Sequence, residues 1–165
     1  MFKISYSTSK DFFSKLETKY YILIALPMAI ISVSFLKMYS ERVISFHPEL
    51  YGKIYIAVFL ILMFAMFFIY FKYMAKIKEI RLEENLRLQL DKYAKEILKF
   101  NLFQQVLSLF ASVCFAVTGD GFYGFCYIIL LVFVSSMRPN IFAIRRTLKL
   151  KKEVHQLLLN QGELV

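Results

Sequence analysis

The sequence predicts an all-α integral membrane protein with four transmembrane helices. Residues 54–71 contain no charged or amide side chain, and residues 102–118 form a second run without charge. A helix of about twenty residues crosses a hydrocarbon core of roughly 30 Å, since each residue adds about 1.5 Å. The composition agrees, because 59% of the residues are hydrophobic, whereas a soluble domain has only about half. We therefore expect one membrane domain over residues 1–165.

The four expected spans are separated by charged segments or by a turn. Pro27 lies inside the first span and is expected to kink it, which neighbouring helices can accommodate in a membrane. Only Gly119, Asp120 and Gly121 separate the last two spans, so these two helices must form an antiparallel hairpin. The spans occupy residues 20–36, 54–71, 102–118 and 121–137.

The distribution of lysine and arginine predicts that both chain ends lie in the cytoplasm. Eighteen of these residues precede the first span, follow the fourth or lie in residues 72–101, and 3 lie in residues 37–53. Four spans place the larger group on one side of the membrane, and basic residues favour the cytoplasmic side. Ser40 and Asp120 are then expected to be accessible from outside. The net charge of +9 is explained first by the orientation of the chain in the membrane and by contact with lipid head groups. Binding of nucleic acid is a weaker explanation.

The charged segment over residues 72–101 is expected to be helical as well. Its apolar residues recur every three or four positions, on one face of a helix. We expect the second span to continue into the cytoplasm, to turn near residues 83–87, and to return as a helix entering the third span. One alternative is a helical hairpin that packs on itself, and the other is a stalk whose apolar stripe binds a partner or a second copy. The stripe consists of Leu82, Leu86, Leu90, Tyr93 and Ile97.

The two ends of the chain predict further helices beside the membrane. Thr8 and Asp11 have the spacing of a capping box and precede an apolar stretch, so a short interfacial helix is expected before the first span. The cytoplasmic tail over residues 138–165 is expected to form a basic amphipathic helix. Such a helix attracts anionic lipid head groups, although a solvated positive flank would have the same composition. The candidate head-group ligands are Arg145, Arg146, Lys149, Lys151 and Lys152.

Polar residues of the third span recur every four positions on one helix face, which Gln104, Ser108, Ser112 and Ala116 define. Small residues at this spacing let membrane helices approach closely, and the amide can bond to a neighbouring helix. Helix packing is the first interpretation. The second is a polar face that lines a pore, which would need several copies around an axis.

Residues that carry chemistry are missing from the sequence. His47 and His155 have no nucleophile or metal-ligand partner at a recognised spacing, and there is no phosphate-binding glycine loop. Cys114 and Cys126 lie at similar depth on the expected hairpin, where a disulfide is conceivable but free thiols are commoner. We expect no enzyme activity, no cofactor and no metal site. Nucleic-acid binding is not expected either, because the basic segments lack exposed aromatic residues between the charges.

The C-terminal third resembles a family of small bacterial membrane proteins. Thr118-Gly119 after the third span, Arg138-Pro139 after the fourth, and a basic tail with Leu148 and Leu150 occur in this order. In this respect the chain is similar to four-span bacterial membrane proteins that have no assigned activity. The resemblance implies a location in the bacterial inner membrane and implies no chemistry.

Two classes of function remain. The first is a non-enzymatic accessory, scaffold or interaction subunit that binds partners through its cytoplasmic helices, within a homo-oligomer or a complex with other proteins. The second is a homo-oligomeric pore or small passive transporter lined by the polar face of the third span. Coupled transport is disfavoured, because no span interior contains a carboxylate.

Overall fold

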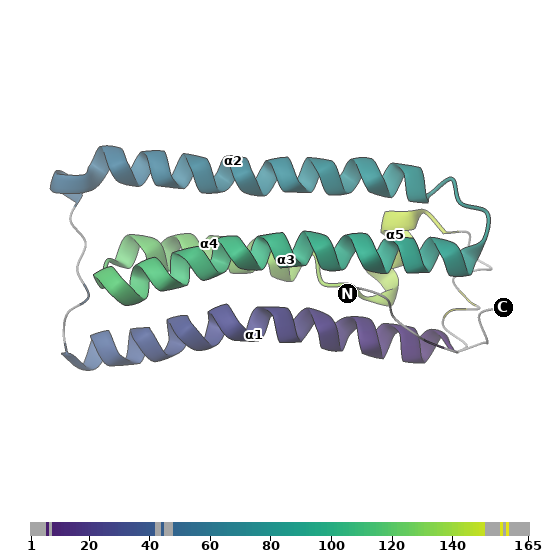
Figure 1. The fold of residues 1–165 in the computed structure, drawn as a ribbon, viewed down its shortest axis with the longest axis horizontal. Coiled ribbons are helices and arrows are strands. Elements are labelled where there is room, and N and C mark those ends of the chain that lie inside the picture. Colours follow the sequence, from purple (N-terminus) through teal and green to yellow (C-terminus); the bar gives the residue numbers. More distant parts are fainter. Residues whose placement is uncertain are drawn as a thin grey trace. The chain divides into compact units, whose positions relative to one another are not determined.

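The computed structural model describes residues 6, 8–41, 44, 48–150, 156 and 158, with side chains for all of these except residues 48–51. Within these residues the fold is all-helical, as the sequence predicts, and it contains no strand. Lys151 and Lys152 lie outside the described residues, as do His47 and His155. Figure 1 shows the helices α1 (Ser9–Glu41), α2 (Pro48–Ile80), α3 (Leu86–Thr118), α4 (Gly121–Ser136) and α5 (Ile141–Leu148).

Three of the described helices are long and apolar enough to cross a membrane, namely α1, α3 and the part of α2 from Gly52 to Ile80. A fourth candidate arises only if α4 and α5 count as one broken span. The 16 residues of α4 give a length of about 24 Å, somewhat short of a hydrocarbon core of roughly 30 Å. The structure therefore contains three or four candidate spans.

The long helices extend well beyond the expected spans. Each of α1, α2 and α3 has 33 residues, which corresponds to about 50 Å. The expected N-terminal interfacial helix is the first part of α1, which also continues through Pro27. Between α2 and α3 the chain turns over residues 81–85, and the Asn85 side chain accepts a hydrogen bond from the Leu88 amide at 3.0 Å. This contact caps the start of α3.

The chain divides into two compact units. Unit 1 comprises Met1–Ile22, Tyr70–Asn101 and Met137–Val165, and unit 2 comprises Leu23–Ile69 and Leu102–Ser136. The unit boundaries fall close to the ends of the expected spans. Charged residues gather in the three segments of unit 1, and the long apolar runs form unit 2.

Unit 1 has an apolar interior that all of its helical segments share. The α1 segment contributes one helical face, the α2 and α3 segments contribute the faces beside their common turn, and α5 contributes two side chains. Among the described residues of unit 1, the buried apolar side chains include Phe12, Leu16, Tyr20, Tyr73, Ile77, Ile80, Leu90, Tyr93, Ile97, Leu98, Ile144 and Leu148. Charged side chains lie mainly outside this core, as in a protein that folds in water.

Unit 2 has a core built from side chains of its four helices. Its buried members come from α2, α3 and α4, and Ile31 of α1 packs against them. Phe115 of α3 packs beside Gly124 of α4, where a Cβ atom would lie at an ordinary van der Waals distance of 3.6 Å from the ring. The buried members of this core are Leu62, Met66, Ala111, Cys126, Tyr127 and Leu130.

Candidate functional site

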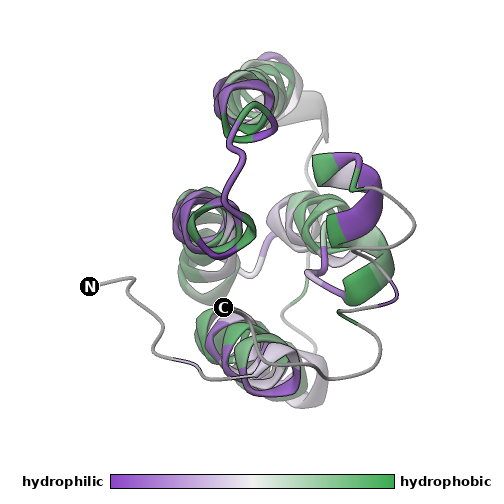
Figure 2. Cartoon of the chain, turned by 90° about the vertical axis from the view of Figure 1, so that its right-hand side faces the viewer, coloured by the Kyte–Doolittle hydropathy of each residue, from purple (hydrophilic) through white to green (hydrophobic). Residues whose placement is uncertain are grey.

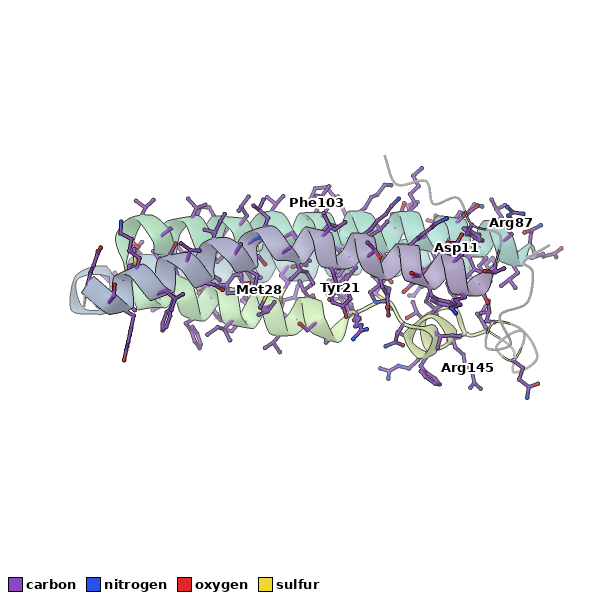
Figure 3. All side chains as sticks on the ribbon, turned by 90° about the horizontal axis from the view of Figure 1, so that it is seen from below. Asp11, Tyr21, Met28, Arg87, Phe103 and Arg145 are labelled. Atoms are coloured by element: carbon purple, nitrogen blue, oxygen red, sulfur yellow. The ribbon has the colours of Figure 1, made fainter. Side chains whose placement is uncertain are left out.

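Unit 2 has polar side chains inside and large apolar side chains outside. Gln104 and Ser112 are 0% exposed, whereas Phe64 is 74% and Val117 is 79% exposed. Phe103 on α3 is another exposed aromatic residue (Figure 3). Water would penalise this surface, but lipid would not, because its acyl chains solvate apolar side chains on every helix. The outer surface of unit 2 therefore suits a hydrocarbon environment.

The polar face of α3 lies inside unit 2. Gln104, Ser108 and Ser112 are buried, and Ala116 is half-buried. The Ser112 hydroxyl lies 3.2 Å from the Pro27 carbonyl oxygen of α1 and 2.8 Å from the Ser108 carbonyl oxygen. These contacts join α1 to α3 and fit the helix-packing interpretation. A face that is covered within one chain leaves little room to line a path between several copies.

The side-chain amide of Gln104 is buried without a hydrogen-bond partner among the described residues. The Tyr127 hydroxyl of α4 is also without one there. A buried unpartnered amide costs about 1–3 kcal/mol. Gln104 therefore does not form the bond to a neighbouring helix that its place on the polar face suggests.

One end of unit 2 is fastened by a polar contact that the sequence analysis missed. The Tyr55 hydroxyl of α2 donates a hydrogen bond to the Asp120 carboxylate, and the other carboxylate oxygen accepts from the Phe122 amide at 2.9 Å. The Tyr55 ring stacks on the Phe122 ring with centroids 4.4 Å apart. Asp120 is only 7% exposed, so the expectation that it is accessible from outside is wrong. Its partner lies 65 positions away in the sequence, and no local pattern indicates it.

The apolar stripe predicted for partner binding is divided by the structure. Leu90, Tyr93 and Ile97 are buried in the core of unit 1, whereas Leu82 lies in the turn before α3 and is 83% exposed. Leu86, the first residue of α3, is half-buried. Most of the stripe thus packs on unit 1 itself. Contact with a partner through it stays a prediction, and only Leu82 and Leu86 are accessible for such a contact.

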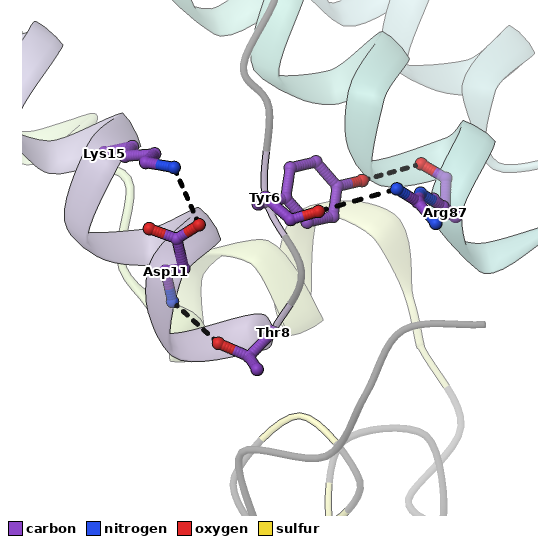
Figure 4. A network of polar contacts seen from close by, with 5 residues as sticks. All are labelled: Tyr6, Thr8, Asp11, Lys15 and Arg87. Atoms are coloured by element: carbon purple, nitrogen blue, oxygen red, sulfur yellow. Dashed lines mark hydrogen bonds and ion pairs between the residues drawn. The ribbon is translucent and has the colours of Figure 1, made fainter.

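A network of polar contacts joins the beginning of the chain to α3 within unit 1 (Figure 4). The Tyr6 hydroxyl donates to the Arg87 carbonyl oxygen at 3.2 Å, and the Arg87 guanidinium lies 3.5 Å from the Tyr6 carbonyl oxygen. Burial, helped by the negative charge of Asp91, raises the pKa of Tyr6 above its ordinary value, so this hydroxyl stays protonated as a donor. The Asp11 amide donates to the Thr8 hydroxyl at 3.3 Å, and the Asp11 carboxylate pairs with Lys15 at 2.7 Å. Thr8 therefore caps α1 as predicted, but the Asp11 carboxylate binds Lys15 instead.

Helix α5 is held in unit 1 by its apolar side and by a contact near its C-terminal end. Ile144 is 0% and Leu148 is 2% exposed. At the first end, the Asn140 side chain accepts a hydrogen bond from the Ala143 amide at 2.7 Å. At the other end, the Arg81 guanidinium donates to the Thr147 carbonyl oxygen at 2.7 Å. Its capping contacts order this short helix beyond what eight residues achieve alone.

Both cysteines are free, with Cys114 half-buried and Cys126 buried. Among the described residues, no group of three histidine, cysteine or acidic side chains is placed to hold a metal ion. The main groups of polar side chains among the described residues are the polar face of α3, the Tyr55–Asp120 contact and the charged surface of unit 1. Comparisons with models of known protein families, with curated proteins and with solved structures gave no match for this chain.

Proposed function

We propose that the protein is a non-enzymatic, multi-pass membrane protein that acts as an accessory, scaffold or interaction subunit. The difference between its two units carries this proposal. Unit 2 exposes large apolar side chains and buries polar ones, which suits lipid, while unit 1 has an apolar core and a charged surface, which suits water. Such a chain presents a folded water-facing unit at a membrane. We propose the bacterial inner membrane as its location, because the C-terminal third resembles small four-span bacterial membrane proteins.

The assembly of unit 1 from three separate segments of the chain supports four membrane crossings. Its three segments are joined by two stretches of unit 2, which contain α1 with α2 and α3 with α4. The three segments bond to one another, because the Arg81 side chain donates to the Thr147 carbonyl oxygen and Arg138 pairs with the Glu17 carboxylate. Segments in contact lie on the same side of a membrane, so each stretch must cross an even number of times. If α3 crosses, α4 must return, and a span of 16 residues is accommodated by local thinning of the bilayer.

The orientation that we propose places unit 1, and with it both chain ends, in the cytoplasm. Cysteine introduced at Asn85 should react with a membrane-impermeant maleimide only after permeabilisation, and cysteine at Ser40 should react in intact cells. Both positions are exposed. The unmodified chain supplies the background, because its two cysteines lie in unit 2 with one buried and one half-buried. Labelling of position 85 in intact cells would overturn the orientation.

The tip between α2 and α3 is the surface that we propose for contact with a partner protein. Leu82 is 83% and Leu88 is 43% exposed, so the tip offers two apolar side chains whose burial by a partner would be favourable. The same tip could meet a second copy of the chain. The protein would then act as part of a homo-oligomer or of a complex with other proteins.

Site-specific photo-crosslinking in native membranes tests this function. A photoreactive amino acid at Leu88 should give a protein adduct of defined mass, and replacing Leu82 and Leu86 with serine should abolish it. The matched control is the same photoreactive residue at Phe64, which is 74% exposed on unit 2 and should react mainly with lipid. An equal protein adduct at Phe64, or none at Leu88, would count against an interaction surface at the tip.

The pore or passive transporter remains the alternative prediction. No observation on the described residues favours it, since the polar face of α3 is covered within one chain. Flux into liposomes that contain the protein, and loss of this flux in the Gln104→Leu variant, would support a pore. The leucine would make the constriction apolar, and an apolar constriction excludes water.

A further inference from the structure

Helix α5 has one face in the core of unit 1 and another face that is exposed. Ile144 and Leu148 are buried, whereas Phe142 is 67% exposed and Arg145, Arg146 and Lys149 are also exposed. Figure 2 shows hydrophilic and hydrophobic segments side by side in this short helix. The exposed face combines three cations with one aromatic ring. Packing of unit 1 does not require it.

The three cations of this face lie in a long stretch of sequence without acidic residues. No acidic residue occurs between Asp120 and Glu153 in the sequence. Among the described residues, Arg145, Arg146 and Lys149 take part in no ion pair, while other cations of unit 1 do. The ion pairs within the described part of unit 1 include Lys15–Asp11, Lys76–Glu79, Lys92–Glu83, Lys99–Glu96 and Arg138–Glu17. The α5 face therefore presents a concentrated positive charge.

The same residues surround a hollow on the surface of unit 1. It has a volume of about 460 Å³, and it is lined by Phe142, Arg145, Arg146, Lys149 and Leu150. It is an open depression rather than an enclosed cavity. Lys149 has the left-handed backbone conformation that ends α5, and the Leu150 amide bonds back to the Arg145 carbonyl oxygen at 3.1 Å. The last turn of α5 is thus ordered around the hollow.

We propose that this hollow binds the phosphate head group of a single anionic phospholipid. Arg145, Arg146 and Lys149 would hold the phosphate, since guanidinium groups bond to phosphate oxygens through two N–H groups at once. Phe142 and Leu150 would contact the glycerol and the upper acyl chain. The negative end of the α5 dipole opposes an anion, but it amounts to about half a charge against three full positive charges.

The proposal rests on the membrane location proposed above and makes it more specific. Four residues separate the end of α4 from the start of α5, and an extended chain covers at most about 3.6 Å per residue. If α4 crosses the membrane, α5 cannot move far from the head-group layer. A lipid is therefore favoured over nucleic acid, whose phosphates would offer the same chemistry.

Native mass spectrometry of the full chain in detergent tests the proposal. The wild-type chain should retain one phosphatidylglycerol molecule and bind phosphatidylcholine at least about tenfold more weakly. The variant Arg145→Gln/Arg146→Gln/Lys149→Gln should lose this preference. The matched control Lys10→Gln/Lys78→Gln/Lys95→Gln removes three exposed charges elsewhere in unit 1 and should keep it within about twofold. An equal loss in both variants would overturn a specific site and leave only a general attraction to positive charge.

Further measurements separate the remaining outcomes. Displacement of the lipid by millimolar inorganic phosphate or by a short oligonucleotide would show that a free phosphate or a nucleic acid is the better ligand, and would overturn the proposal. The variant Arg145→Lys/Arg146→Lys/Lys149→Arg keeps the three charges but only one guanidinium group, so it should still prefer phosphatidylglycerol and bind it more weakly than the wild type does. Loss of the preference in this variant at the wild-type melting temperature would also overturn the proposal. Extraction of the protein from native membranes by alkaline carbonate would instead contradict the membrane location itself.

Discussion

Replacing Leu90 with alanine should lower the free energy of unfolding by about 2–5 kcal/mol, which is the cost of removing a buried leucine and leaving a cavity. Leu90 is 0% exposed, in the core of unit 1. Reversible unfolding in mixed detergent micelles, followed by far-ultraviolet circular dichroism, measures the change. A loss of this size would be among the largest that a single side chain of unit 1 can produce.

The control for this experiment comes from the other end of the same stripe. Leu82 is 83% exposed, so Leu82→Ala should change stability by no more than about 0.5 kcal/mol. If Leu82→Ala destabilises the chain as strongly as Leu90→Ala, the assignment of Leu82 to an accessible tip is wrong. If Leu90→Ala is harmless, unit 1 does not depend on its own apolar core.

Replacing Ser112 with leucine should also destabilise the protein, in this case within unit 2. The side chain is 0% exposed and its hydroxyl lies 3.2 Å from the Pro27 carbonyl oxygen. A larger side chain here must separate α1 from α3, and overpacking of this kind costs about 1–3 kcal/mol. The same unfolding experiment in micelles measures the effect.

Two further variants identify the cause of the Ser112→Leu effect. Ser112→Ala removes only the hydroxyl and should cost about 0.6 kcal/mol, the average for a hydrogen bond between membrane helices. Ala57→Leu adds the same bulk at an exposed position of α2 and should be nearly neutral in lipid. A comparable loss for Ala57→Leu and Ser112→Leu would mean that the small-residue face of α3 is not a packing surface.

Local sequence patterns predict the helices well, because apolar runs and helical periodicity are properties of neighbouring residues. The run over residues 54–71 lies within α2, and the stripe through Leu90, Tyr93 and Ile97 lies on one face of α3. Helix ends are predicted less well. Helix α2 continues past the expected span, as the helix propensity of its charged residues favours, but it ends at Ile80, before the turn expected near residues 83–87.

Contacts between distant segments could not be predicted from the sequence. The core of unit 1 brings Phe12 of α1 and Ile144 of α5 into the same apolar interior as Leu90, and each stripe alone indicates only that some partner exists. Gln104 shows the opposite limit. Its place on a polar face suggests a hydrogen bond, yet the amide has no partner among the described residues, because the positions of neighbouring helices decide whether an acceptor is within reach.

The discontinuous composition of unit 1 has a consequence for biosynthesis. A ribosome delivers its first segment, Met1–Ile22, long before Met137–Val165. In the proposed topology, the apolar face of Phe12 and Leu16 therefore stays uncovered until the last of four spans has been inserted with the correct polarity. If one span were left out of the membrane, the segments of unit 1 would lie on opposite sides and that face could not be buried. Closure of unit 1 would then depend on the correct insertion of every span.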